Sequence, residues 1–251
     1  MTDNKTQESK VPEVVFLFWI IKILATTLGE TGGDALSMSF GLGYLTSTII
    51  FAIIFIVSVF IQIRAIKFNP ALYWITIIAT TTVGTTLADF CDRSLGIGYM
   101  GGSLILFALL ASSLLIWYKN SGSISVENVN TPKTEMFYWI TIMFSQTLGT
   151  AFGDWAADSA GLGYVGAGMI FALLLSLVAM AYFFTKISHT ILFWSAFILT
   201  RPLGAVVGDF LDKPISSGGL ELSRYTASLV LICSISILLF LFKQKAASKL
   251  H

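Results

Sequence analysis

The chain has 251 residues, of which 55 % are hydrophobic and only 12 % are charged, and its formal net charge is +1. A soluble globular protein carries roughly 25 % charged residues, so this composition excludes an ordinary soluble domain. The balanced charge indicates no class of partner, and the sequence contains no nucleic-acid-binding motif.

Eight apolar segments follow one another along the chain. Each has about 20 residues, the length that an α-helix needs to cross ~30 Å of hydrocarbon. In chain order they cover residues 14–33, 45–63, 71–90, 100–118, 136–155, 165–184, 190–210 and 225–242. The sequence therefore predicts an all-α integral membrane protein with eight transmembrane helices.

The basic residues outside these segments lie mainly on one side. Ten fall on the side of the two termini, and three, Arg93, Lys213 and Arg224, fall on the opposite side. By the positive-inside rule, we expect both termini to be cytoplasmic. The polar start of the chain lacks a small-residue cleavage site, so we expect no signal peptide.

One pattern occurs in the first, third, fifth and seventh segments. A tryptophan is followed ten residues later by a glycine, and five residues after that by an aspartate. The tryptophans are Trp19, Trp74, Trp139 and Trp194, the glycines Gly29, Gly84, Gly149 and Gly204, and the aspartates Asp34, Asp89, Asp154 and Asp209. The pattern indicates four tandem copies of a two-helix unit.

The spacing of the copies divides the chain into halves. Copies one and two, and copies three and four, are displaced by 55 residues, whereas copies two and three are displaced by 65. We expect a polar N-terminus at 1–12, a first half at 13–118, a cytoplasmic linker at 119–135, a second half at 136–242 and a basic cytoplasmic tail at 243–251. Since each copy contains two helices, all copies have the same orientation. They should surround a pseudo-twofold axis, close to fourfold, along the membrane normal.

Small residues predict which helices lie inside. In each motif-bearing segment a second small residue follows the motif glycine by four positions, and this spacing lets helix backbones approach closely in a membrane. The pairs are Gly29 and Gly33, Gly84 and Ala88, Gly149 and Gly153, and Gly204 and Gly208. The other segments are almost purely aliphatic and aromatic, so we expect them outside, facing lipid.

Eight of the fourteen acidic residues lie at the ends of the motif-bearing segments. They are Glu30, Asp34, Asp89, Asp92, Asp154, Asp158, Asp209 and Asp212. Each segment carries two of them, three or four positions apart and hence on one helix face. One interpretation is a metal site for a divalent cation, because hard cations bind carboxylate oxygens. The other is that these acids cap the helix ends at the water boundary. Four copies in register favour the cation site.

Three charged residues break the fourfold likeness. Glu30 has threonine or alanine at the equivalent position of the other copies, Arg201 stands where they have threonine or glutamine, and Lys22 lies within the first segment. A charge inside a membrane is costly unless it is paired, so we expect Arg201 to bind one of the acids. Alternatively, it acts as a tethered cation that substrate and protons displace. The asymmetry indicates one site and not a symmetric pore.

Other classes of site have little support. The two histidines, His189 and His251, and the two cysteines, Cys91 and Cys233, provide neither a histidine-rich metal site nor a disulfide framework. The sequence has no phosphate-binding glycine loop and no nucleophile elbow. We therefore expect no bound cofactor and no enzymatic activity.

The fourfold pattern, with its opening LGETGGD, resembles a family of bacterial integral membrane proteins that carry a repeat of unknown function. The resemblance spans about 13–242 and implies an eight-helix protein of the bacterial cytoplasmic (inner) membrane, without implying an activity. The first copy is also similar to the Glu-x-Gly-Asp signature of small calcium and manganese exchangers. Here an extra glycine, Gly33, precedes Asp34.

We expect a transporter that exports a divalent cation, manganese first, in exchange for protons. Carboxylates bind a metal when ionised and release it when protonated, so each state excludes the other. Its partners would be the lipid bilayer, the cation and protons. Three alternatives stay open: a transporter of an organic cation or amine, a membrane enzyme that binds a magnesium–diphosphate lipid on its DFCD and DFLD motifs, and a structural or partner-binding membrane protein.

Overall fold

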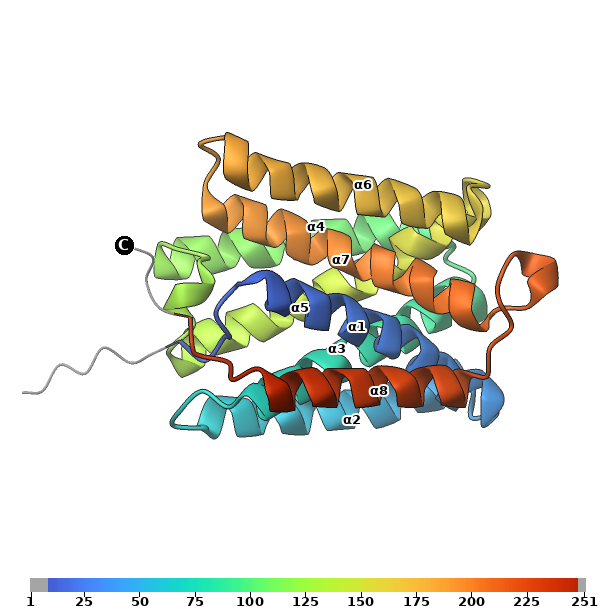
Figure 1. Ribbon diagram of the computed structural model, residues 1–251, viewed down its shortest axis with the longest axis horizontal. Coiled ribbons are helices and arrows are strands. Elements are labelled where there is room, and N and C mark those ends of the chain that lie inside the picture. The colour runs from blue at the N-terminus through green and yellow to red at the C-terminus, as the bar shows by residue number, and fades with distance from the viewer. Residues whose placement is uncertain (1–8, 248–251) are drawn as a thin grey trace, which may run out of the picture.

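The computed structural model describes residues 9–247, and this part of the chain is all-α (Figure 1). Eight α-helices follow one another, as predicted. They are α1 Phe16–Asp34, α2 Gly43–Arg64, α3 Pro70–Asp89, α4 Tyr99–Ser121, α5 Pro132–Asp154, α6 Gly163–Phe184, α7 His189–Asp212 and α8 Arg224–Leu241. The largest shift from the predicted bounds is at the start of α5, where the Thr131 side chain caps the helix.

The motif-bearing helices form an inner ring. α1 contacts α3 and α7, and α5 contacts the same two helices, so the four close on one another. Each remaining helix packs on the outside of the next inner helix: α2 on α3, α4 on α5, α6 on α7, and α8 back on α1. In the apolar stretches of α3 and α7, 72 % of the residues are buried, against 11 % to 22 % in the four outer helices. The glycine pairs predict this arrangement.

Each motif glycine leaves room for one side chain of the next inner helix. The contacts are Gly29 with Thr81, Gly84 with Gln146, Gly149 with Arg201, and Gly204 with Thr26. These four side chains are equivalent in the repeats, so the contact passes round the ring and closes on itself. A Cβ at any of the four glycines would lie 3.0 Å or less from its neighbour, which is closer than side chains normally pack. We call this set of contacts the glycine interlock.

Five sets of equivalent positions, each four residues after the last, are buried in all four repeats. Because residues four apart lie on one helix face, the sets form successive layers inside the ring. From the end where the inner helices begin, the layers are Phe18, Tyr73, Tyr138 and Phe193; Lys22, Ile77, Ile142 and Phe197; Thr26, Thr81, Gln146 and Arg201; Glu30, Thr85, Thr150 and Ala205; and Asp34, Asp89, Asp154 and Asp209. The ring interior is therefore aromatic at one end and acidic at the other.

Aromatic side chains close the ring where the inner helices begin. The hydroxyl groups of Tyr73 and Tyr138 share a hydrogen bond of 2.6 Å. The indole of Trp74 donates to the side chain of Gln244, and that of Trp194 donates to a carbonyl of the linker. The motif tryptophans thus attach the C-terminal segment and the linker to the ring.

The inner helices do not all end in the same way. A π-helical turn follows the motif aspartate in the first three repeats, at Ala35–Ser39, Phe90–Ser94 and Trp155–Ser159. A tight turn comes next, in which glycines such as Gly41 (φ 70°) and Gly43 (φ 74°) adopt positive φ. In the fourth repeat, α7 runs on as a regular helix to Asp212, and a longer loop, 213–223, replaces the tight turn.

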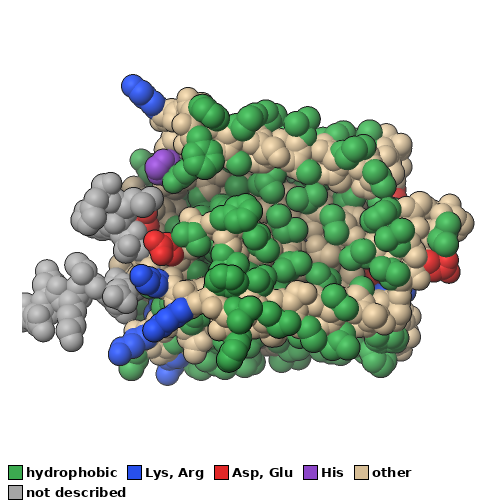
Figure 2. Space-filling model, in the orientation of Figure 1, with side chains coloured by type: hydrophobic (Ala, Val, Ile, Leu, Met, Phe, Trp, Pro, Cys, Tyr) green, Lys and Arg blue, Asp and Glu red, His purple; other side chains and the backbone are tan. Residues whose placement is uncertain are grey.

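The surface between the two ends of the bundle is apolar. Figure 2 shows hydrophobic side chains over the middle of one face and charged side chains gathered at its two ends. Six of the helices, α2, α3 with its π-helical turn, α4, α6, α7 and α8, are long and apolar enough to cross a membrane. α1 and α5 fall short of this because their buried faces carry polar and charged side chains. These features indicate a multi-pass membrane protein.

The first described residues belong to the fold, although the sequence assigns them to a polar terminus. Lys10 forms an ion pair of 2.7 Å with Glu135 near the start of α5. Pro12 and Ala246 form an isolated antiparallel bridge, so the two ends of the described chain meet. The predicted cytoplasmic positions 1–8 and 248–251 lie outside the described residues.

Candidate functional site

Six of the eight candidate acids converge where the inner helices end. This acidic cluster consists of Glu30, Asp34, Asp89, Asp154, Asp209 and Asp212, all of which are buried. Three sets of three offer carboxylate oxygens within 4.8 Å of one another. Glu30, Asp34 and Asp209 each belong to two of the sets, so the sets overlap in one continuous group.

Arg201 binds the acidic cluster from inside the ring. It is fully buried and forms an ion pair of 2.9 Å with Glu30. The same nitrogen, Nη2, donates to the hydroxyl of Thr85 at 2.5 Å and to that of Thr150. Glu30, Thr85 and Thr150 occupy equivalent positions, so Arg201 of the fourth repeat binds one position in each of the other three. One arginine thus binds all three of these positions.

Lys213 and Arg224 bind the cluster from the end of the bundle. Lys213 forms an ion pair with Asp34, and its Nζ lies 3.1 Å from Asp209. The Nε of Arg224 lies 2.8 Å from Asp212 and 3.8 Å from Asp34. Burial lowers the pKa of Lys213, but three neighbouring carboxylates raise it by more, so its net pKa lies above the usual value. Lys213 is therefore a cation at neutral pH.

Arg93 joins the aspartates of two further helices. It follows α3 in the π-helical turn, and its Nε lies 2.9 Å from Asp89, while its Nη2 lies 3.4 Å from Asp154 of α5. Its side chain is 30 % exposed, whereas both aspartates are 2 % exposed. Arg93 thus stands between the cluster and solvent.

The four basic side chains do not neutralise the cluster. Six carboxylates face four cations, which leaves a formal excess of two negative charges. Within residues 9–247, the Oδ1 atoms of Asp34, Asp154 and Asp212 have no hydrogen-bond partner. Unpaired buried carboxylate oxygens are costly, so this group favours binding a further cation or protons.

Asp92 and Asp158 do not join the cluster, although their spacing from the motif aspartates predicts it. Asp92 lies against Gly102 of α4, and Asp158 is exposed. Both lie in π-helical turns, in which the backbone leaves the regular α-helical repeat. Asp212, which joins the cluster, lies in the last turn of the regular helix α7.

Lys22 has no acidic partner in the described part of the chain. It is fully buried, and its amine has no hydrogen-bond partner there. The amine lies 4.1 Å from the centre of the Phe197 ring, the equivalent residue of the fourth repeat. Of the two expected charge partners, Arg201 therefore contacts the acids and Lys22 does not.

Three cations of the site are not predicted from the sequence, in which Arg93, Lys213 and Arg224 count as loop residues. A signal exists for two of them, because Arg93 and Lys213 each follow a motif aspartate by four positions. Arg224 carries no comparable signal, since the loop 213–223 separates it from α7.

Comparison with known proteins places each two-helix unit in one family. The family described as Repeat of Unknown Function (DUF347) matches residues 17–68, 72–123, 137–188 and 192–246. Each match covers one inner helix and the outer helix after it. No curated protein and no solved structure has a significant match to the chain. With four copies of this repeat along nearly its whole length, the chain belongs to the Repeat of Unknown Function (DUF347) family.

Proposed function

We propose that the protein is a multi-pass transporter of a divalent cation in the bacterial cytoplasmic membrane, that it exchanges the cation for protons, and that manganese is its first candidate cargo. The observation that carries the proposal is the acidic cluster, in which overlapping sets of carboxylate oxygens lie within 4.8 Å of one another. Carboxylate oxygens suit hard divalent cations. Ionisable residues inside membrane bundles commonly mark ion pathways.

The charge of the cluster supports both the cargo and the exchange. Its formal excess of two negative charges would be balanced by one divalent cation or by two protons. In a weakly polar interior, the balanced states are favoured over the charged one, because uncompensated charge is desolvated there. A cluster that alternates between these two loads exchanges one divalent cation for two protons.

When no cargo is bound, the basic side chains balance part of the negative charge of the cluster. Asp34 has two basic partners, Lys213 and Arg224, which come from one side of the site. A cation that enters among the free oxygens competes with these partners for the same carboxylates. Release of Lys213 or Arg224 would then accompany cargo binding, and their return would accompany cargo release.

The two ends of the ring fit the two faces of a transporter. The positive-inside rule puts both termini in the cytoplasm, which places the acidic end outside and the aromatic layer on the cytoplasmic side. The aromatic layer is buried and hydrogen-bonded, so it closes the ring on that side. Export requires a second conformation in which this layer opens to the cytoplasm.

Manganese-driven proton flux in proteoliposomes tests the proposal. Asp34→Asn and Glu30→Gln keep the size of each side chain but cannot ionise, so both should reduce the flux at least tenfold. Asp158→Asn is the matched control, because Asp158 is exposed and lies outside the cluster. Melting temperatures in detergent show that each variant is folded.

Three results would contradict the proposal. Flux of Asp34→Asn and Glu30→Gln at the wild-type rate would make the cluster a structural cap of the helix ends. If the wild-type protein exchanges protons for an organic amine and not for manganese, the cargo is an organic cation and not a divalent metal. Equal losses in the cluster variants and in Asp158→Asn would remove the cluster as the origin of the effect.

A further inference from the structure

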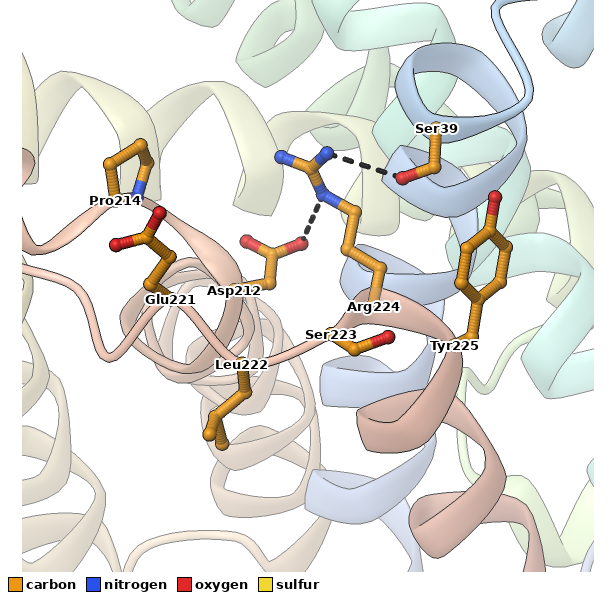
Figure 3. A pocket seen from close by; sticks show the side chains of 8 residues that line it. All are labelled: Ser39, Asp212, Pro214, Glu221, Leu222, Ser223, Arg224 and Tyr225. Carbon is orange, nitrogen blue, oxygen red and sulfur yellow. Dashed lines mark hydrogen bonds and ion pairs between the residues drawn. The ribbon is translucent and has the colours of Figure 1, made fainter.

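A pocket of about 300 Å³ lies at the acidic end of the bundle. It is formed by the π-helical turn after α1, the loop after α7 and the start of α8 (Figure 3). Asp212 and Arg224, which contact each other at the acidic cluster, are part of its wall. The pocket is thus in direct contact with the candidate cation site.

Arg224 lies between the pocket and Asp34 of the cluster. In Figure 3 its guanidinium group extends from α8 between Asp212 and Ser39, to which it donates at 2.8 Å and 3.3 Å. Asp34, 3.8 Å from Arg224, is fully buried, whereas the Arg224 side chain is 20 % exposed. A movement of Arg224 away from Asp212 would therefore open the pocket towards Asp34.

We infer that this pocket is the outer vestibule of the cation site, that it takes a hydrated divalent cation, and that Arg224 is the displaceable plug between vestibule and cluster. The inference rests on the proposed function and names the route to the same site. Three features support the inference: the pocket opens to solvent, the Arg224 side chain blocks its inner end, and carboxylate oxygens without a hydrogen-bond partner lie beyond Arg224.

The size of the pocket suits this occupant. A pocket of this volume holds several water molecules. An octahedral ion with six oxygen ligands fits within it. Glu221 adds a carboxylate to the wall, and its backbone φ of 54° is unusual for a residue with a side chain. Strained residues of this kind often occur at functional sites.

The difference between the repeats explains why the entrance lies here. The first three inner helices continue into a π-helical turn and a tight glycine turn. The fourth has the loop 213–223 in their place, and this loop contributes one wall of the pocket. One entrance in one repeat agrees with a single asymmetric site.

Blocking the pocket tests the route. In a Cys91→Ser, Cys233→Ser background, Leu222→Cys places a thiol in the pocket wall. Leu162→Cys places one at the same end of the third repeat, and the two leucines are 46 % and 42 % exposed. Reaction with a bulky trimethylammonium methanethiosulfonate reagent should reduce manganese transport at least tenfold for Leu222→Cys and less than twofold for Leu162→Cys. Equal transport by the labelled variants would overturn the inference.

A second measurement does not depend on transport. Reaction of Asp34 with a water-soluble carbodiimide, measured by mass spectrometry, should be at least fivefold faster in Arg224→Gln than in the parent. The label on Leu222→Cys should suppress this reaction, and the label on Leu162→Cys should not. If Asp34 reacts equally fast with the pocket blocked, the route is wrong. If the parent protein does not carry manganese, the proposed function fails, and this measurement alone decides the route.

Discussion

The ion pair between Arg201 and Glu30 should hold the inner ring together. Glu30 is 2 % exposed, and an Arg201→Met variant removes its ion-pair partner at 2.9 Å. Thr85 and Thr150 keep hydrogen bonds to carbonyl groups of their own helices, so Glu30 suffers most of the loss. Removing one partner of a buried pair costs about 3–5 kcal/mol, because the other charge remains desolvated. We expect the free energy of unfolding to fall by about this amount.

A double-mutant cycle separates the charge pair from the packing of the arginine side chain. Glu30→Gln removes the negative charge, and the double variant with Arg201→Met leaves no unpaired charge at this position. The two single losses together should exceed the loss in the double variant by about 2 kcal/mol or more. Unfolding in mixed detergent and dodecyl sulfate micelles, followed by tryptophan fluorescence, gives the four free energies. Losses that add to within about 0.5 kcal/mol would refute the reasoning.

Lys22→Met should leave the melting temperature unchanged or raise it, because the buried amine has no hydrogen-bond partner in the described chain and an apolar side chain carries no desolvation penalty. A clear fall would show that the contact of the amine with the Phe197 ring outweighs that penalty. Gly204→Ala should lower the free energy of unfolding by about 1–3 kcal/mol because the added carbon overlaps a threonine of α1, whereas Gly166→Ala, with its nearest neighbour at 3.5 Å, should be tolerated. Equal melting temperatures of these two variants would contradict the glycine interlock. A thiol introduced at Ser217 should react from outside intact cells and one at Ser123 only after permeabilisation; the opposite pattern would reverse the proposed orientation.

The architecture can be predicted because its main features occur four times. A glycine that keeps its distance from a tryptophan and an aspartate in every copy marks the helices that must approach closely. The side chains that pack against these glycines cannot be predicted from the sequence in the same way. Thr81 lies 52 residues after Gly29, and nothing in either segment shows that these two positions touch. That information appears once the helices are placed in a ring.

The membership of the acidic cluster can be predicted only in part. The rule that residues four apart share a helix face holds for Asp209 and Lys213, which form an ion pair. Where a π-helical turn follows the motif aspartate, it holds for Asp89 and Arg93, which also form an ion pair, but not for Asp154 and Asp158, since Asp158 is exposed. Sequence patterns that presuppose regular α-helix do not reveal such a turn. Spacing along the sequence therefore does not by itself decide which acids face the site.

The long sequence separation between Glu30 and Arg201 has a consequence for the synthesis and membrane insertion of the protein. The two residues are 171 positions apart, and α1 is made first while α7 is the last inner helix. At about 5–20 residues per second, roughly 10 to 30 s pass before the ribosome has added Arg201. Through this interval, α1 carries Glu30 without its buried partner, and α8, which covers α1, does not yet exist. Until the last repeat has been inserted, the charge of Glu30 in the nascent chain must therefore be compensated by water, by protonation or by the insertion machinery.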